Sequence, residues 1–444
     1  MKLRNITVRN LRLFGDTEQS ICPHPDKHAL VLLGDNGAGK TTLLYGCSVM
    51  LSQYFEHFPN IAKKEFTFDD IRNVDNERKA DYMHFGITID TAGLPSLGNG
   101  ALLSADKYLR GDGTNVPSSV LEPIKSYGGR MKSSIDGEEA SALPILAYYG
   151  TERGQIKAPE RRREFSTIFP RWASYDDALE PATNFKRFFT WFERNEDEER
   201  RAQIARKDFG YRSHTLEAVR RALEMLFDNY RNPRVATSPL RFVMDDVSDA
   251  DAPKEIRIER MSDGYRIMTA LVADIAARMA EANPTLECSG LEDPLMSAGI
   301  VLIDEIDLHL HPALQRKVLR KLTGIFPNVQ FIVSTHSPNV VLGALDIIDV
   351  VRLENGIIHS GINLAQYEKY DVSLMLLSDL FDLDNVRTQE YKERNDEYEG
   401  LLAQPSLTEE ERARLDTLSQ QLDGFSSEEV RQFKEHLNLI AGGR

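Results

Sequence analysis

The segment VLLGDNGAGKTTLL, residues 31–44, constrains the fold of this 444-residue chain more than any other stretch. An apolar run precedes it and a stretch of helical character follows it. The segment fills the pattern G-x-x-x-x-G-K-[ST] with Gly34, Gly39, Lys40 and Thr41. Strand, glycine-rich turn and helix start form the order that a phosphate-binding loop requires. The sequence therefore predicts an α/β fold in which a helix begins at a nucleotide site.

The residues of this loop suit a triphosphate. Glycines leave backbone N–H groups facing inward without a Cβ in the way, the helix N-terminus adds partial positive charge, and Lys40 adds a full one. We predict that Thr41 places its hydroxyl on Mg²⁺. A glycine-rich turn that binds nothing is the alternative, and the character of both flanking segments argues against it. The predicted nucleotide-binding residues of the loop are Asn36, Gly37, Ala38, Gly39, Lys40, Thr41 and Thr42.

A second motif supplies the acids that such a site needs. The apolar run 300–303 predicts a buried parallel strand, and Asp304 and Glu305 follow it directly. An aspartate at the end of that strand can hold Mg²⁺, and the glutamate can take a proton from an attacking water. The alternative is a strand whose terminal acids only cap the next helix. The matching phosphate loop favours the catalytic interpretation.

Two further segments add candidate residues. His336 ends the apolar segment 329–336, where a histidine fits a γ-phosphate sensor better than an inert core residue. Ser262, Asp263 and Gly264 stand ahead of a long amphipathic helix, and a Ser-x-Gly turn at a helix start is an anion site. Taken alone, that turn is explained equally well as an ordinary helix cap. The predicted catalytic residues are Lys40, Glu305 and His336, and the predicted metal ligands are Thr41 and Asp304.

Together these motifs carry a family resemblance. The phosphate loop, the signature MSDGY, the Walker B segment VLIDEIDLHLHP and the switch STHSP occur in the order of an ABC-type ATPase head. They resemble the class that includes RecF, the chromosome-structural-maintenance proteins and the OLD-family nucleases. The segments PILAYYGTER and YDVSLMLLSDLF make the chain look most like the stand-alone Septu-type PtuA ATPases of bacterial anti-phage systems, some of them attached to retrons.

This resemblance implies a P-loop ATPase head with a mixed core sheet flanked by helices, a helical insertion lobe and a C-terminal helical appendage. It implies ATP and Mg²⁺ as cofactors and a homo-oligomer, a dimer or a multiple of dimers, in which the turn at 262–264 closes over the nucleotide of a second copy. The implied function is an ATPase that senses or regulates an HNH-type nuclease acting in trans in anti-phage defence. The chain ends at Arg444 without a Toprim nuclease domain, so we expect that it does not cut DNA itself.

Other functions stay open at this stage. A RecF-like, ATP-dependent DNA-binding clamp in repair is the main alternative, and a transporter motor would need a membrane partner. A switch that binds ATP and hardly hydrolyses it is a further alternative, because Asp263 stands where many relatives have glycine and places negative charge near the partner's triphosphate. Gln155 is the candidate for the residue that links Mg²⁺ to the middle lobe. Asp307 lies where the class has a loop that crosses to the partner's site.

Composition limits the partners. The formal net charge is −15 and the isoelectric point is near 5.3, so any nucleic-acid contact must be local or belong to a partner. The basic run PERRREF, 159–165, is one candidate, and a solvated turn explains it equally well. The three cysteines form no C-x-x-C pair, and no apolar run approaches a membrane span, which favours a cytoplasmic location without a membrane. His309 and His311 have no third ligand nearby, so we expect a structural or subunit-contact role.

The chain divides into five predicted parts. These are an ATPase lobe with the phosphate loop, 1–90; an irregular Gly/Ser-rich insertion, 91–143; a return strand and helical insertion lobe, 144–255; a lobe with signature, Walker B and switch histidine, 256–360; and the helical appendage, 361–444. In the third part a helix behind Ser213 is expected to carry an apolar stripe of Leu216, Val219, Leu223, Leu226 and Tyr230. Two capping boxes open the expected appendage helices, Thr408 with Glu411 and Ser426 with Glu429.

Overall fold

A computed structural model describes residues 1–75, 78–92, 102–154, 170–181, 185–237, 240–249, 252–383, 389–402 and 408–422. The chain forms two compact units, Met1–Val372 and Ser373–Arg444. The C-terminal unit therefore begins later than residue 361, where the sequence predicts the appendage. Within the described residues no helix is long and apolar enough to cross a membrane.

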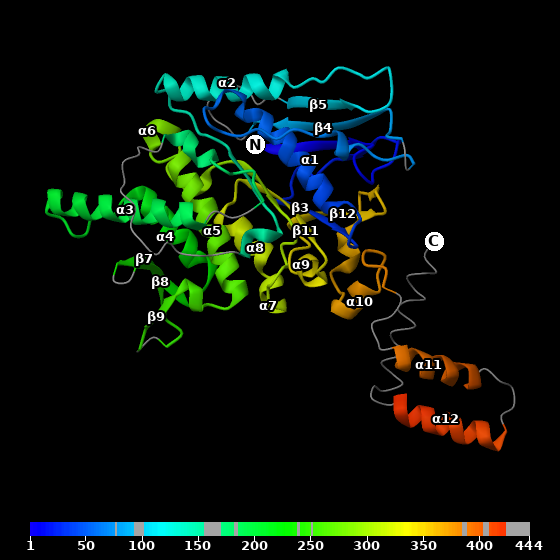
Figure 1. Ribbon diagram of the computed structural model, residues 1–444. Helices are drawn as coiled ribbons and strands as arrows, with labels where there is room; N and C mark the ends of the chain where they lie inside the picture. The colour runs from blue at the N-terminus through cyan, green and yellow to red at the C-terminus, as the bar shows by residue number, and fades with distance from the viewer. Residues whose placement is uncertain are drawn as a thin grey trace. The chain divides into compact units, whose positions relative to one another are not determined.

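A six-stranded sheet forms the core of the first unit and confirms the predicted α/β head (Figure 1). Five of its strands are parallel and the edge strand β13 is antiparallel, so the sheet is mixed as predicted. Its inner strands at 29–34, 299–303 and 329–335 are buried along almost their whole length, as is typical of parallel strands in an α/β sheet. The strands, in spatial order, are β13 (Ile357–His359), β12 (Ile348–Glu354), β3 (Ala29–Gly34), β11 (Val329–Thr335), β10 (Gly299–Ile303) and β6 (Ile145–Tyr149).

A second, antiparallel sheet lies beside this core. Its strands, in spatial order, are β2 (Gln19–Ile21), β1 (Lys2–Arg9), β4 (Tyr82–Asp90) and β5 (Leu102–Arg110). The helix α2 (Glu122–Asp136) packs against β5 (Figure 1). The prediction of an irregular segment over 91–143 is thus wrong. The Gly- and Ser-rich composition concealed β5, which pairs along the whole of β4 and alternates buried Leu103 and Ala105 with more exposed residues.

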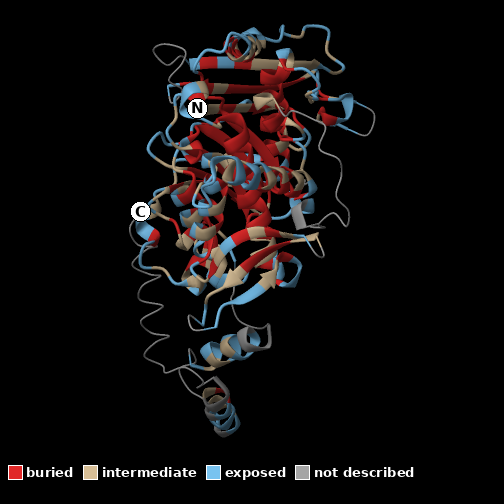
Figure 2. Cartoon of the chain, turned by 90° about the vertical axis from the view of Figure 1, so that its left-hand side faces the viewer, coloured by how far each residue is buried: buried red, intermediate tan, exposed pale blue. Residues whose placement is uncertain are grey.

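Helices surround the core sheet. The phosphate loop leads into α1 (Lys40–Ser52), and α5 (Asp263–Ala282) is buried over most of its length. Figure 2 shows that buried residues concentrate in the interior of the first unit, where these helices meet the sheets. Short helices complete it: α6 (Leu286–Ser289), α7 (Pro312–Gln315), α8 (Val318–Ile325) and α9 (Pro338–Leu342), with α10 (Val372–Leu376) at the unit boundary.

The insertion lobe contains two long helices and an unpredicted sheet. The helices are α3 (Phe185–Arg206) and α4 (His214–Leu226), and the strands are β7 (Tyr230–Thr237), β8 (Leu240–Asp246) and β9 (Lys254–Arg257). The predicted stripe is correct up to Leu226, but Tyr230 begins β7, because Phe227 adopts an extended backbone that ends α4. Ser213 occupies the N-cap position without a side-chain cap bond, and its N–H donates to Glu199.

The described part of the C-terminal unit contains α11 (Gln389–Leu402) and α12 (Glu409–Leu422). The capping box at the start of α12 is confirmed: the Thr408 N–H donates to Glu411 Oε2 at 2.8 Å, and the Glu411 N–H donates to Thr408 Oγ1 at 3.3 Å. Arg414 joins the two helices through a two-pronged bond to Glu397. The box predicted at Ser426 and Glu429 lies outside the described residues.

Candidate functional site

The phosphate loop connects β3 to α1 at the carboxyl edge of the core sheet. Two of its glycines sit where no other residue fits. Gly39 has a φ of 110°, and a Cβ there would lie 2.8 Å from the Phe14 ring. A Cβ on Gly34, whose φ is 150°, would lie 2.2 Å from the Leu353 carbonyl oxygen of the neighbouring strand β12. The tertiary structure thus requires the glycines that leave the backbone of the loop bare.

Backbone carbonyl groups of the phosphate loop hold the Lys40 side chain in place. The residue is only 5% exposed, and Nζ donates to the carbonyl oxygens of Gly34 at 2.7 Å and Asp35 at 2.9 Å. Burial lowers the pKa of Lys40, and the nearby carboxylates of Asp304 and Glu305 oppose that shift. The result is a cation held at the phosphate loop, close to the two acids of the second motif.

Asp304 accepts hydrogen bonds from two hydroxyl groups. Thr41 Oγ1 donates to its Oδ2 at 2.8 Å, and Ser334 Oγ donates to its Oδ1. This follows from the sheet register, because Ile303 pairs with Val333 and the next residue of each strand emerges at the same edge. Thr41 and Asp304 therefore lie together, as the sequence predicts. A hydroxyl and a carboxylate oxygen are the hard donors that Mg²⁺ prefers, so the residues fit the predicted ion.

The backbone turns away from the direction of β10 at Glu305. Its φ is 47°, a left-handed conformation uncommon for residues other than glycine, and its N–H donates to Ser334 Oγ at 2.7 Å. The Ile306 N–H donates to the Ser334 carbonyl oxygen. Ser334 thus fixes both acids of the motif, a role that the sequence analysis missed although the residue stands in the quoted STHSP segment. Its position on the neighbouring strand was the available signal.

His336 lies half-buried beyond the end of β11. Its Nε2 is buried and has no hydrogen-bond partner among the described residues. Burial lowers the pKa of the imidazole, and the positive charge of Lys40 lowers it further. The neutral ring therefore keeps a buried nitrogen unbonded beside the phosphate loop, which suits a ligand oxygen.

The loop after the acids is fixed by a residue that sequence reasoning missed. Gln315 Nε2 donates to the carbonyl oxygens of Asp307 and Leu310, and its Oε1 accepts from Ser337 Oγ at 2.7 Å. Asp307 also accepts a bond from Thr335 Oγ1. His311 occupies the N-cap of α7, where its ring accepts from the Ala313 N–H. Gln155 and the basic run 159–165 lie outside the described residues.

The signature turn begins α5 and contacts this same loop. Ser262 is an exposed N-cap residue without a side-chain cap bond, and Asp263 pairs with Arg266 at 2.7 Å. A Cβ on Gly264 would lie 2.9 Å from the His309 carbonyl oxygen, so the turn packs closely on that loop. The structure brings Lys40, Thr41 and Asp304 together and leaves Ser262 and Asp263 facing solvent within one copy.

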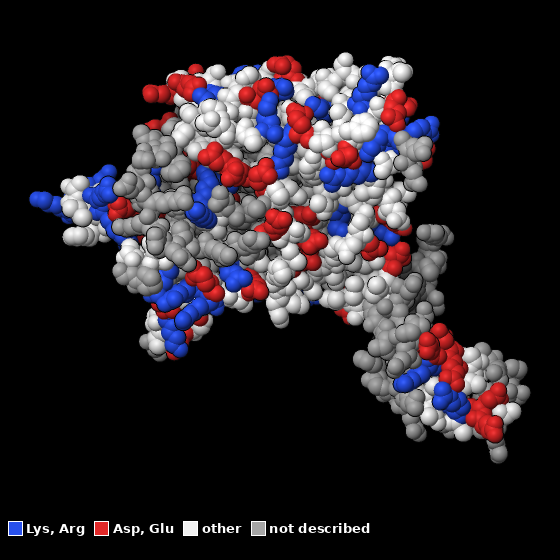
Figure 3. Space-filling model, viewed as in Figure 1, with Lys and Arg blue, Asp and Glu red and all other residues white. Residues whose placement is uncertain are grey.

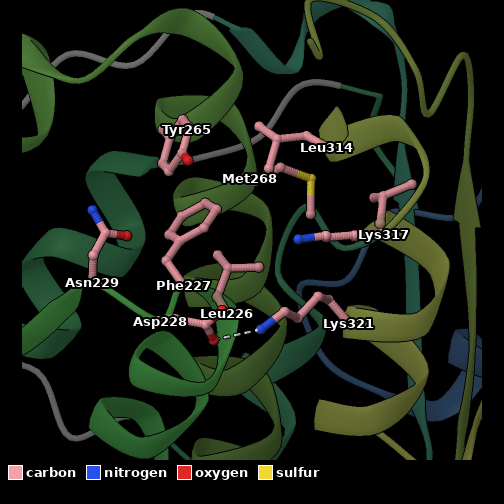
Figure 4. Close-up of a pocket in the computed structure, with 10 residues that line it drawn as sticks. Leu226, Phe227, Asp228, Asn229, Tyr265, Met268, Leu314, Lys317 and Lys321 are labelled. Carbon is pink, nitrogen blue, oxygen red and sulfur yellow. Dashed lines mark hydrogen bonds and ion pairs between the residues drawn. The ribbon is translucent and has the colours of Figure 1, made fainter. Parts of the chain in front are cut away.

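Behind the signature turn, aromatic packing holds the first turn of α5. Tyr265 packs on Phe227 at a ring separation of 4.4 Å and meets Tyr230 edge-on. A cavity of about 110 Å³ opens next to this pair, as Figure 4 shows. Its lining comes from the end of α4, from α5 and from α7 and α8, and includes no residue of the phosphate loop. Lys321 closes one side of it through an ion pair with Asp228.

Comparison with known proteins identifies the family. The family model described as "AAA domain" matches residues 5–228, half of the chain. The chain belongs to the AAA-domain ATPases. A second AAA-domain model, whose description also names the AbiEii toxin of type IV TA systems, matches residues 135–342. The two matches cover the phosphate loop, the signature, the acids and the switch histidine.

Individual relatives show which AAA-domain ATPases this chain is similar to. The Retron Vc95 probable ATPase of Vibrio cholerae is 28% identical over 77% of this chain and 71% of its own. A Septu protein PtuA of Bacillus mycoides is 32% identical over 94% of this chain, which spans about half of that protein, 49%. A solved SMC head bound to the C-winged helix domain of ScpA is 15% identical, with a TM-score of 0.46 over 82% of this chain. The resemblance to the ABC-type class, and within it to retron and Septu ATPases, is confirmed.

Proposed function

We propose that this ATPase binds Mg·ATP at the phosphate loop and hydrolyses it. The observation that carries the proposal is the contact of Thr41 with Asp304 at 2.8 Å, which joins the two motifs. Lys40 binds the phosphates, and Thr41 and Asp304 hold Mg²⁺, which when bound offsets phosphate charge. Glu305 accepts the proton of the attacking water, and His336 contacts the γ-phosphate.

The site is completed by a second copy of the chain. Ser262 and Asp263 face solvent, and a helix start that carries exposed N–H donors suits a phosphate of another molecule. Asp263 stands where many relatives have glycine, and its ion pair with Arg266 offsets the negative charge that it adds. Closure of two copies over two nucleotides is therefore compatible with Asp263.

Complementation tests this arrangement. Lys40→Ala removes the phosphate cation and Ser262→Arg blocks the signature turn, so each variant alone is expected to lose turnover. Mixing them creates heterodimers with one intact composite site, and about a quarter of wild-type activity should return, because a symmetric dimer has two equivalent sites. Two inactive variants that stay inactive when mixed, while still assembling, would show that each copy hydrolyses ATP by itself.

We further propose that ATP turnover controls a nuclease acting in trans in anti-phage defence, and that this chain does not cut nucleic acid. The names of its retron and Septu relatives and the resemblance described above support the proposal. Co-purification from the native host, followed by identification of bound proteins, tests it. An HNH nuclease whose activity changes with ATP supports it; DNA cleavage by the purified chain that survives Glu305→Gln argues against it.

A further inference from the structure

The free end of the α3–α4 hairpin forms a surface with no role in the ATPase site. We define the hairpin tip as residues 204–212, which link α3 to α4. Figure 3 shows Lys and Arg side chains gathered where α3 ends, and Figure 1 shows that this end projects away from the core sheet. The tip carries three cations and one acid, in a chain whose formal net charge is −15.

The cations of the tip are not neutralised locally. Among the described residues, Arg206, Lys207 and Arg212 have no carboxylate within ion-pair distance. The acid of the tip, Asp208, accepts a bond from the Gly210 N–H instead. Because charges beyond about 8 Å are screened at physiological ionic strength, the acids elsewhere on the chain do not cancel this local field.

The neighbouring cations of α3 differ in this respect. Three of them each form an ion pair with a carboxylate four residues away on the same helix. The pairs are Arg194 with Glu198 at 2.8 Å, Arg200 with Glu196 at 3.2 Å, and Arg201 with Asp197 at 2.7 Å. Among the described residues 194–212, the cations without an ion pair therefore lie at the tip.

Apolar and aromatic groups lie among these free cations. The Phe209 side chain is 78% exposed and Ile204 is 69% exposed. Arg206 stacks over the Tyr211 ring at 4.1 Å, which orients its guanidinium group. Bonds from Gln203 to the Tyr211 carbonyl oxygen and from Arg212 to the Phe209 carbonyl oxygen hold the loop in shape. The exposed ring is thus presented on an ordered loop beside the exposed Ile204 and Arg206, where a ligand can reach it.

We infer that the hairpin tip binds single-stranded nucleic acid. Unpaired Lys and Arg side chains attract phosphates, and an exposed ring offers a platform on which a base can stack. A duplex hides the faces of its bases, so Phe209 favours a single strand over a duplex. The tip has no residue in the site formed by Lys40 and Asp304, and this binding requires no step of the proposed ATPase cycle.

Fluorescence anisotropy of a labelled single-stranded 20-mer, titrated with the full-length chain without nucleotide, tests the inference. The triple variant Arg206→Gln, Lys207→Gln, Arg212→Gln should bind at least about tenfold more weakly. It should also lose about two units of the slope of log K against log salt, because each phosphate contact on a single strand contributes about 0.7. The matched control, Arg194→Gln, Arg200→Gln, Arg201→Gln, removes the same formal charge and should bind nearly as wild type.

Phe209→Ala should weaken single-strand binding by about tenfold and leave the salt slope unchanged, because stacking is not ionic. Thermal unfolding checks that each variant folds. If the triple variant does not fold, the single variant Lys207→Gln replaces it in the binding assay. Equal affinity of the two triple variants would overturn the inference, as would a wild-type chain that does not bind the oligonucleotide. If polyglutamate displaced the oligonucleotide at an equal concentration of negative charge, the tip would instead be a surface that binds an acidic protein.

Discussion

Ser334→Ala tests how the structure orients the two acids of the site. In the wild type, Ser334 Oγ donates to Asp304 and accepts from the Glu305 N–H, and the residue is fully buried. A hydrogen bond to a charged group contributes about 1.5–3 kcal/mol and a neutral one about 1 kcal/mol. The variant should therefore lower the free energy of unfolding by about 2.5–4 kcal/mol.

The same substitution should also slow ATP turnover. Without its bond to Ser334, the left-handed backbone at Glu305 loses an anchor, and a displacement near 1 Å costs on the order of 100-fold in rate. We expect kcat to fall by about 10- to 100-fold, whereas the affinity for ATP should change little, because the loop glycines and Lys40 are untouched. Steady-state turnover and equilibrium binding of a fluorescent ATP analogue separate the two effects.

Ser297→Ala provides a matched control. Ser297 is also fully buried and exchanges two neutral hydrogen bonds, one from Asn283 and one to the Pro294 carbonyl oxygen, away from the site. It should reduce stability by about 1–2 kcal/mol and leave kcat unchanged. A Ser334→Ala protein that is destabilised but turns over ATP at the wild-type rate would refute the argument that Ser334 positions Glu305.

Three further predictions follow from the site and its supports. Glu305→Gln should keep ATP binding and reduce turnover by at least about 100-fold, since a general base supplies about 10²–10⁴; unchanged turnover removes Glu305 from that role. Gly39→Ala should abolish ATP binding because its Cβ meets Phe14, whereas Gly324→Ala, in the open last turn of α8, should raise stability by about 0.5–1 kcal/mol; denaturant unfolding and ATP titration compare the two. His336 has a folded pKa below 6.5, so the unfolded chain binds its proton more readily, and stability should fall as the pH drops through 6.5 toward that lower pKa. The free energy of unfolding should change less between pH 7.5 and pH 5.5 in His336→Gln than in the wild type. The same change in both proteins would contradict a lowered pKa of His336.

Local motifs made much of the site predictable. The phosphate loop, the acids after β10 and the histidine after β11 are contiguous patterns, and parallel strands bring their carboxyl ends to one edge. Segments whose structure depends on distant partners were harder to predict. The strand β5 is specified by its pairing with β4 across a Gly-rich stretch, and β7 to β9 follow a helix that ends at Leu226 without a strong stop signal.

The sequence by itself determined the chemistry of this protein: a strand, a bare glycine loop, a lysine, a threonine and two acids in the order of a P-loop ATPase. Only the tertiary structure decided how those groups are held. The pairing of β10 with β11 puts Ser334 between Asp304 and Glu305, and the packing of Phe14 excludes any side chain at residue 39. The physical reason is that chemical identity resides in single residues, whereas orientation depends on contacts between segments far apart in the chain.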